Sequence, residues 1–405
     1  MPDIELYNSL TRRKDKLVPM TPGHVSIYAC GPTVYNYAHI GNARQAVVFD
    51  QLVRLLRTQF DQVTYVSNIT DVDDKIIAAA QKTGEPAEDI TKRFTQIYND
   101  DMAALGVVRP DIQPHCTTHI DEMITLIARL IDKGHAYQSD DGHVLFYVPS
   151  FANYGALSGR SRDEQIAGAR VEIADNKRDP ADFVLWKPAQ DNEPGWDSPW
   201  GRGRPGWHIE CSAMAEKHLG LPFDIHGGGA DLKFPHHENE IAQSCCAHAS
   251  EDDLSAFAKM WVHNGFLTVE GEKMAKSIGN VILAHDLIEQ GMPGEVIRLT
   301  LLSAQYSQPL DWSDAAAAQS RAILDKLYKF LYEHRDVEQV EAQVPEDIMA
   351  ALCDDLNTPL AISRLQALLK QDGDPAIIKG QIMAAGDLLN LLQAEPAAWL
   401  GYGQA

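Results

Sequence analysis

The sequence lacks the features of a membrane or secreted protein. No run of roughly 18 or more apolar residues is present, so no membrane-spanning helix is expected. Residues 1–5 lack the basic start and apolar core of a signal peptide, so we expect a cytoplasmic protein. Only 6 of the 405 residues are cysteines, which excludes a disulfide framework. Cysteines this sparse are more often buried, reactive or metal-bound.

Positive charge is also scarce, because 35 Lys and Arg residues face 57 Asp and Glu residues and give a formal net charge of -22. Contacts to nucleic-acid phosphates need lysine and arginine, so this balance argues moderately against nucleic-acid binding. A local basic patch can still suffice on an acidic surface, and residues 12–14 and 202–204 are candidates. Ordinary solvated surface charge explains both stretches equally well.

The first part of the chain predicts a strand, a turn, a helix and a second strand. Residues 25–30 are an apolar run that ends at Gly31-Pro32, and residues 43–56 have apolar side chains at helical spacing. Residues 63–67 form a second candidate strand. This order and spacing favour an α/β fold with a doubly wound, Rossmann-like parallel sheet.

A chain of 405 residues is too long for one hydrophobic core, so two or three domains are expected. The stretch 150–206 is rich in Gly, Pro, Asp and Arg and is interpreted as an inserted, loop-rich segment. After about residue 281 the pattern becomes almost entirely helical. We expect a first catalytic half over 1–118, an inserted connective segment over 119–222, a second catalytic half over 223–309 and an all-α helical bundle over 310–405.

His39 and Asn42 lie where the first strand turns into the first helix. Unpaired amides and the positive end of the helix dipole suit phosphate at such a place. Gly41 allows a nucleotide base to approach the backbone, and a histidine can donate a hydrogen bond to phosphate in a transition state. The pattern alone is weak, because a single histidine at a helix start is more often a cap or a surface residue.

Lys273 and Lys276 lie three residues apart on a loop flanked by glycine. Such a loop can close on ATP and neutralise the leaving pyrophosphate. A solvated lysine pair is the commoner explanation of this pentapeptide by itself. The histidine turn and the lysine loop in this order, separated by an inserted segment, favour a nucleotide site.

Four residues that are far apart in the sequence form a possible zinc site with sulfur, nitrogen and oxygen donors. They are Cys30, Cys211, His236 and Glu240. His236 and Glu240 lie four residues apart, on one face of an expected helix. His237 and Glu238 compete for the same roles, so the residues alone leave the ligand set open.

Seven blocks carry a family resemblance. They are CGPTVY at 30–35, HIGN at 39–42, NITDVDDK at 68–75, PGWHIECSAM at 205–214, GGGADL at 227–232, FPHHENE at 234–240 and KMAKS at 273–277. In this order they resemble the cysteinyl-tRNA synthetases, which are class I synthetases. Any one block is moderate evidence, whereas their joint order is highly specific.

The resemblance implies ATP-dependent activation of L-cysteine and its transfer to the 3′ end of tRNA(Cys) by a monomeric enzyme. It implies one Zn²⁺ per chain, to which the substrate thiolate adds, and Mg²⁺ bound with ATP. The implied residues are Cys30, Cys211, His236 and Glu240 for zinc, Gly31, Thr70 and Trp207 for cysteine, His39, Gly41, Asn42, Gly229, Asp231 and Lys276 for ATP, and His39, Asn42, Lys273 and Lys276 for catalysis.

The sequence departs from the family pattern at three places. Asn42 stands where the class signature ends in histidine, and Ala275 stands where serine is commoner. Asparagine can still donate to phosphate, so activity with altered phosphate contacts is expected. The chain also stops just after the helical bundle, where family members continue into an anticodon-reading domain. We expect either a truncated chain or a protein without that reader.

Four points stay open at this stage. A related enzyme type transfers activated cysteine to the amine of a small amino sugar, and the short C-terminus fits that alternative. A non-catalytic paralogue would be expected to have lost ligands or lysines, and none is lost.

A cluster in the insertion is a candidate for the tRNA end or a small core of its own. It consists of Trp196, Trp200, Arg202 and Arg204. Four cysteines have no assigned role, namely Cys116, Cys245, Cys246 and Cys353.

Overall fold

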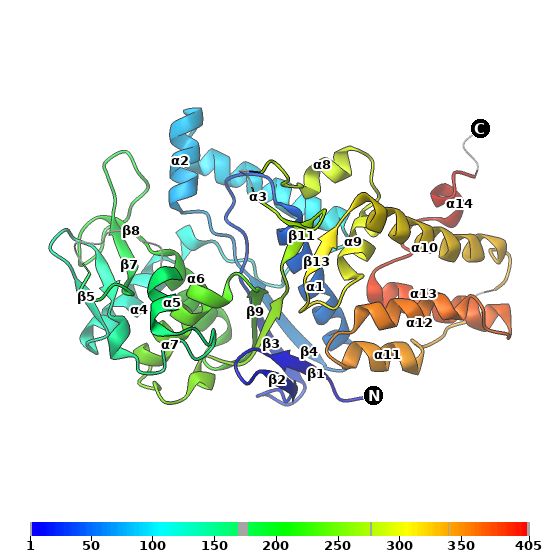
Figure 1. Cartoon of the computed structure of the whole chain (residues 1–405), viewed down its shortest axis with the longest axis horizontal. Helices are drawn as coiled ribbons and strands as arrows, with labels where there is room; N and C mark the ends of the chain where they lie inside the picture. The colour runs from blue at the N-terminus through cyan, green and yellow to red at the C-terminus, as the bar shows by residue number, and fades with distance from the viewer. Residues whose placement is uncertain (1, 169–176, 276–277, 339, 403–405) are drawn as a thin grey trace.

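The computed structural model describes residues 2–168, 177–275, 278–338 and 340–402. A parallel sheet with the strand order β10-β9-β3-β4 lies at its centre (Figure 1). The strands are β3 (His24–Ala29), β4 (Gln62–Ser67), β9 (Phe223–Gly229) and β10 (Ala258–Asn264). The chain runs outward from β3 to β4 and, in the other direction, from β9 to β10. This confirms the doubly wound sheet, and the change of direction lies between β3 and β9.

Helix α1 (Ile40–Arg57) connects β3 to β4. Its apolar residues recur at helical spacing, and Val47 and Leu52 are fully buried. The helix begins after His39, whose Nδ1 accepts a hydrogen bond from the backbone N–H of Asn42. The sequence therefore fixes the start of α1 at the histidine turn.

Two hydrophobic cores cover the two faces of the sheet. In β3, Ile27 belongs to the core that continues into the C-terminal helices, whereas Tyr28 belongs to the core of the inserted segment. Val262 and Trp261 divide in the same way in β10. Side chains alternate along a strand, so neighbouring residues anchor opposite halves of the molecule.

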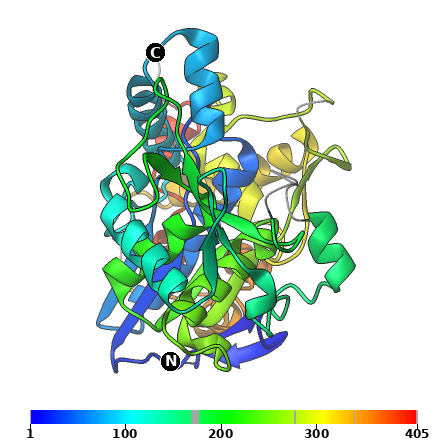
Figure 2. The same ribbon diagram turned by 90° about the vertical axis from the view of Figure 1, so that its left-hand side faces the viewer.

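The inserted segment has its own antiparallel sheet and lies in front in Figure 2. The strands are β5 (Ala136–Gln138), β6 (Val144–Phe146), β7 (Phe183–Pro188) and β8 (Gly203–Pro205). The helices from α2 to α6 are α2 (Asp74–Thr83), α3 (Ala87–Ala104), α4 (Ile120–Asp132), α5 (Arg162–Gly168) and α6 (Trp207–Leu219). The expectation of a loop-rich stretch over 150–206 missed β7 and β8. Both strands are short and separated by glycine and proline, so only their pairing partners define them.

The C-terminal part is helical, as expected. Its helices are α8 (Ala284–Glu289), α9 (Gly294–Leu302), α10 (Asp314–Glu333), α11 (Glu346–Cys353), α12 (Thr358–Leu368), α13 (Pro375–Leu389) and α14 (Pro396–Trp399). Strand β13 (Leu310–Trp312) pairs in parallel with β11 (Leu267–Val269), beyond the domain boundary expected at residue 309. β11 also pairs with β12 (Glu272–Lys273), which forms the hairpin that precedes the lysine loop.

The remaining elements are short. They are β1 (Glu5–Asn8), β2 (Arg13–Lys16), the single turns η1 (Cys116–Thr118), η2 (Val148–Ser150), η3 (Lys233–His237) and η4 (Leu254–Ala256), and helix α7 (Glu238–Ala247). The helix expected to begin near Pro235 thus starts as the π-type turn η3, and α7 begins at Glu238. This turn carries His236, and Glu240 lies in the first turn of α7.

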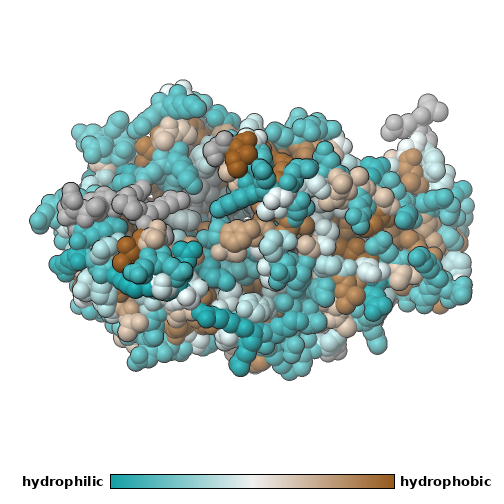
Figure 3. All heavy atoms as spheres, viewed as in Figure 1, coloured by the Kyte–Doolittle hydropathy of each residue, from teal (hydrophilic) through white to brown (hydrophobic). Residues whose placement is uncertain are grey.

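No helix among the described residues has the length and apolar character needed to span a bilayer. Hydrophilic residues cover most of the face shown in Figure 3.

Arg298 on α9 is a fully buried charge that links α1 to the helical bundle. Its guanidinium pairs with the Asp50 carboxylate of α1 at 2.5 Å and donates to Leu389 O of α13 at 2.7 Å. Burial lowers the pKa of Arg298, and Asp50 opposes that shift. The pair therefore holds together two parts of the chain that are far apart in sequence.

We expect Arg298→Ala to lower the free energy of unfolding by about 3 kcal/mol, because it leaves the Asp50 carboxylate buried without its closest partner. Urea-induced unfolding followed by circular dichroism measures this change. Lys329→Ala breaks the exposed pair with Glu333 and is the control, with an expected loss of about 1 kcal/mol or less. Similar losses in both variants would contradict the role given to the buried pair.

Candidate functional site

The candidate site lies where the parallel strands end. Cys30 directly follows β3, Gly229 ends β9, and Asn68 and Thr70 follow β4. In an open α/β sheet, ligands bind outside the carboxyl ends of the strands, at the point where the strand order reverses. The sheet therefore brings three blocks that are far apart in the sequence, at 30–35, 68–75 and 227–232, to one edge.

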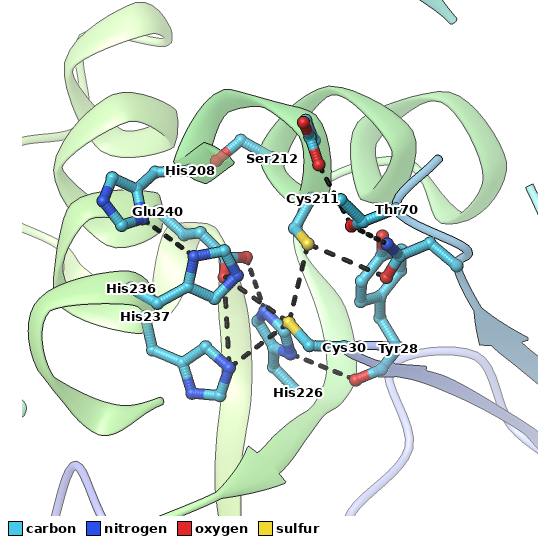
Figure 4. A network of polar contacts seen from close by, with 12 residues as sticks. Tyr28, Cys30, Thr70, His208, Cys211, Ser212, His226, His236, His237 and Glu240 are labelled. Atoms are coloured by element: carbon cyan, nitrogen blue, oxygen red, sulfur yellow. Dashed lines mark hydrogen bonds and ion pairs between the residues drawn. The ribbon is translucent and has the colours of Figure 1, made fainter. Parts of the chain in front are cut away.

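The four predicted metal ligands meet in one buried cluster (Figure 4). The Sγ atom of Cys30 lies 3.6 Å from Cys211 Sγ and 3.6 Å from Glu240 Oε1. His236 Nε2 lies 3.0 Å from the same carboxylate oxygen. The side chains come from the end of β3, from α6, from η3 and from α7. Their donor atoms all lie within 4.8 Å of one another, so a single ion can reach all four.

The cluster holds its charges without contact to bulk water. Burial favours a neutral Glu240, yet His226 and His236 keep the pKa of this carboxyl well below its usual range. Burial opposes a charge on His236, but Glu240 and Cys211 raise its pKa to about 10. A hydrogen bond from Cys30 lowers the pKa of Cys211 to about 6, and burial raises the pKa of Cys30 well above its usual value.

A second donor set shares Cys30 and Glu240 but uses His226 and His237. Both ring nitrogens of His226 are occupied, by Tyr28 O at 3.0 Å and Glu240 Oε2 at 2.7 Å. The other set includes a second sulfur donor, Cys211, and the nitrogen His236 Nε2, which lies 3.0 Å from Glu240 Oε1. Two thiols, an imidazole and a carboxylate are the donors that zinc prefers, so the set with Cys211 and His236 is favoured.

Side chains outside the cluster orient its members. His236 Nδ1 lies 2.8 Å from His208 Nδ1, and the Trp207 ring stacks on His236 with centroids 4.1 Å apart. His237 Nδ1 lies 2.8 Å from His263 Nε2. Partners of this kind fix the orientation and tautomer of a metal-ligating imidazole. No sequence pattern assigns a role to His208 or His263, because they contact His236 and His237 only in the folded chain.

The residues predicted to bind cysteine surround the cluster. Trp207 stacks on His236, the backbone N–H of Gly31 donates to Asn68 Oδ1 at 2.9 Å, and Thr70 Oγ1 donates to Glu210 Oε2 at 3.1 Å. A Cβ on residue 31 would lie 1.5 Å from Asn68 O, so only glycine fits there. A cavity of about 290 Å³ lies against this region and is lined in part by Trp207.

The histidine turn and the lysine loop lie together, although their roles stay predictions. Ile40 N donates to Ile282 O at 2.8 Å, and Ala284 N donates to Ala38 O at 3.1 Å. A Cβ on Gly41 would lie 3.7 Å from the terminal methyl of Met274. The segment after the lysine loop is thus hydrogen-bonded to the start of α1.

Lys273 lies at the end of β12, with its side chain exposed to solvent. Lys276 lies outside the described residues. Asn280, which the sequence analysis did not select, closes this loop: its Oδ1 accepts from Ala275 N at 2.8 Å, and its Nδ2 donates to Lys273 O at 3.2 Å. The one feature of the sequence that could have indicated these hydrogen bonds is an asparagine four residues after Lys276.

Gln45 of α1 links the two predicted halves of the site. Its Nε2 donates to Cys30 O at 2.5 Å, and its Oε1 accepts from Gly229 N at 3.0 Å. A Cβ on residue 229 would lie 2.3 Å from Asp231 Oδ1. The Asp231 carboxylate can therefore occupy this position only because residue 229 is a glycine. Sequence reasoning missed Gln45 because it lies outside the short histidine motif.

The aromatic and basic cluster of the insertion behaves as a small core. Arg204 is buried and pairs with Asp74 at 2.6 Å and Glu193 at 2.7 Å. The Trp186 and Trp200 rings pack edge to face, with centroids 6.1 Å apart. Arg204 therefore has its charge already paired, which argues against its role as a contact for the tRNA end.

Comparison with known proteins defines the class of this chain. Residues 16–322 match the family model of the tRNA synthetases class I (C) catalytic domain. Two solved structures share the fold: methionyl-tRNA synthetase of Mycobacterium tuberculosis in complex with methionyl-adenylate, and a LeuRS-tRNA-LeuAMS ternary complex from Agrobacterium radiobacter. The first has a TM-score of 0.63 at 15% identity and covers 93% of this chain and 91% of its own. The second has a TM-score of 0.65 at 12% identity and covers 96% of this chain and 86% of its own.

Curated relatives are much more similar in sequence. The cysteine–tRNA ligase of Rhodospirillum rubrum is 55% identical over 98% of this chain and 86% of the relative. That of Paramagnetospirillum magneticum is 57% identical over 99% of this chain and 88% of the relative. The chain belongs to the cysteine–tRNA ligase family of class I tRNA synthetases.

We expect Cys211→Ser to weaken Zn²⁺ binding at the cluster by at least about tenfold, because a hydroxyl replaces one of two sulfur ligands. Competition with a chromophoric chelator measures the affinity of the tightest site. Cys353→Ser changes a buried cysteine of α11, far from the cluster in the fold, and should leave this affinity unchanged. Undiminished affinity in Cys211→Ser would show that Cys211 is not a ligand.

Proposed function

We propose that this chain activates L-cysteine with ATP and transfers the cysteinyl group to the 3′ end of tRNA(Cys). The observation that carries the proposal is the buried donor cluster of two thiols, an imidazole and a carboxylate, which Gln45 of α1 contacts at Cys30. The names of the curated relatives support the same reaction. They do not favour the alternative, in which a small amine accepts the activated cysteine.

In the first step, an oxygen of the cysteine carboxylate bonds to the α-phosphorus of ATP as the bond to pyrophosphate breaks. In this step the protein orients the reactants and stabilises the charge that develops on phosphate. We assign this to His39 and Asn42 at the positive end of α1, together with Lys273 and Lys276 of the lysine loop. Mg²⁺ is proposed to accompany ATP.

The His39 side chain supports this assignment by its position. It is exposed at the N-terminus of an 18-residue helix, and its Nδ1 accepts from the backbone N–H of Asn42. This hydrogen bond leaves Nε2 as the nitrogen that can donate to phosphate. Gly41, Gly229 and Asp231 are proposed to lie against the nucleotide, because Gln45 connects their segments.

Zn²⁺ fits the donor set of Cys30, Cys211, His236 and Glu240. When bound, it would take the substrate thiolate as a further soft ligand, which the hydroxyl of serine replaces poorly. We propose that Gly31, Thr70 and Trp207 hold the rest of the amino acid. Because the site bonds the one group that distinguishes the substrate, discrimination against serine of about 10⁴-fold needs no editing domain.

The proposed domains follow the fold. We propose catalytic halves over 1–118 and 223–309, a connective insertion over 119–222 and a bundle over 310–405, with β13 added to the second half by its pairing to β11. We propose that the chain acts as a monomer. We propose a cytoplasmic location, where ATP, cysteine and tRNA are available.

Transfer of labelled cysteine to deacylated total tRNA, with ATP and magnesium, tests the proposed function. We expect charging above the background without enzyme, in proportion to enzyme concentration. A preparation that supports cysteine-dependent pyrophosphate exchange but charges no tRNA would contradict the proposed acceptor and favour a small amine. Glycyl and seryl charging should stay at background in the same reactions.

We expect His39→Ala to lower kcat for cysteine-dependent pyrophosphate exchange by about 10²–10³-fold, because one donor to the transition-state phosphate is lost. The KM for cysteine should change little, since the zinc cluster is untouched. Asn42→His restores the residue commoner in the class and should keep exchange within about tenfold of the unaltered chain. A large rise in the KM for cysteine without a fall in kcat would contradict the role of His39.

A further inference from the structure

A second group of metal-ligating side chains lies outside the proposed active site. His135 follows α4, Cys246 lies in the last turn of α7, and Glu251 lies in the loop after α7. One donor atom of each lies within 4.8 Å of the donors of the other two. Cys246 is fully buried, whereas the side chains of His135 and Glu251 are 13% and 36% exposed. The group is thus reachable from solvent on one side.

The hydrogen bonds of His135 assign its proton. The hydroxyl of Ser150 has one hydrogen and donates it to Tyr147 O at 2.6 Å. Its Oγ must therefore accept from His135 Nδ1, which lies 2.9 Å away. The other ring nitrogen, Nε2, then carries a lone pair in the neutral imidazole.

This lone pair faces a second acceptor. Glu251 Oε1 lies 3.1 Å from His135 Nε2. Two acceptors at this distance repel each other unless a second proton or a cation lies between them. A ring N–H that donates to a protein oxygen while the other nitrogen faces outward is also the usual arrangement of a metal-ligating histidine.

The surroundings favour a cation over an isolated thiol. Burial, followed by the Glu251 carboxylate, raises the pKa of Cys246, which keeps its thiol protonated in the absence of a metal ion. The last turn of α7 carries Cys246, and the turn that ends α4 carries His135, so the negative ends of two helix dipoles point toward the group. A soft divalent cation would deprotonate the thiol and satisfy all three donors.

We propose that His135, Cys246 and Glu251 form a second site for a divalent cation of the zinc type, with its fourth position open to solvent. The site would join the end of α4 to the end of α7, the helix that presents Glu240 to the first cluster at its other end. It is independent of the proposed active site, because none of its three ligands belongs to that cluster.

Titration of the metal-free full chain with Co²⁺ tests this proposal. Two equivalents are expected to bind, and the second should add a thiolate-to-cobalt absorption band in the near ultraviolet. Glu251→Gln and Cys246→Ser are expected to weaken the second equivalent by at least about tenfold and leave the first unchanged. Cys246→Ser should also remove the absorption of the second equivalent.

The chain offers matched controls. Asp252→Asn removes the same charge from the neighbouring exposed residue, and Cys245→Ser changes the adjacent buried cysteine, so both should retain two equivalents. Binding of a single equivalent by the unaltered chain would overturn the proposal and leave His135 and Glu251 as a plain ion pair. A second equivalent that persists in Glu251→Gln, with the absorption unchanged, would overturn it as well.

Discussion

The parallel pairing of β3 with β9 is the constraint on which the rest of the site depends. The backbone N–H of Cys30 donates to Gly227 O at 3.1 Å, and this register sets the end of β3 beside the glycines that end β9. A Cβ on residue 227 would lie 2.1 Å from the Phe49 ring of α1, so the helix can pack this closely only on glycine. One strand pairing thereby fixes the first thiol, the glycine segment and the helix that begins at His39.

Burial gives the cluster its chemical character. A carboxylate without contact to water is costly unless it is paired, and Glu240 is paired with two imidazoles. The hydrogen bond from Cys30 lowers the pKa of Cys211, and burial raises the pKa of Cys30. A divalent cation would bind both sulfurs as thiolates and release their protons. The arrangement has the properties of a metal site rather than of a structural ion-pair network.

Much of this could be predicted from the sequence, for identifiable reasons. Helix α1 has apolar residues at helical spacing, strands β3 and β4 are short apolar runs, and the four ligand residues lie in blocks that resemble a known family. What could not be predicted depends on contacts between distant segments. Strands β7 and β8 are defined by their pairing partners, Gln45 joins Cys30 to Gly229, and His208 contacts the ligand His236 across 28 positions. The sequence left Arg204 open between a contact for the tRNA end and part of a small core, and only the folded chain pairs it with the carboxylates of Asp74 and Glu193.

The central claim is that a metal held by this buried cluster selects a thiol substrate. Pyrophosphate exchange with cysteine and with serine, before chelation, after chelation and after return of Zn²⁺, tests it most directly. We expect exchange with cysteine to disappear in the metal-free chain and to return with Zn²⁺, whereas exchange with serine stays low throughout. Undiminished exchange with cysteine in a folded, metal-free chain would contradict it.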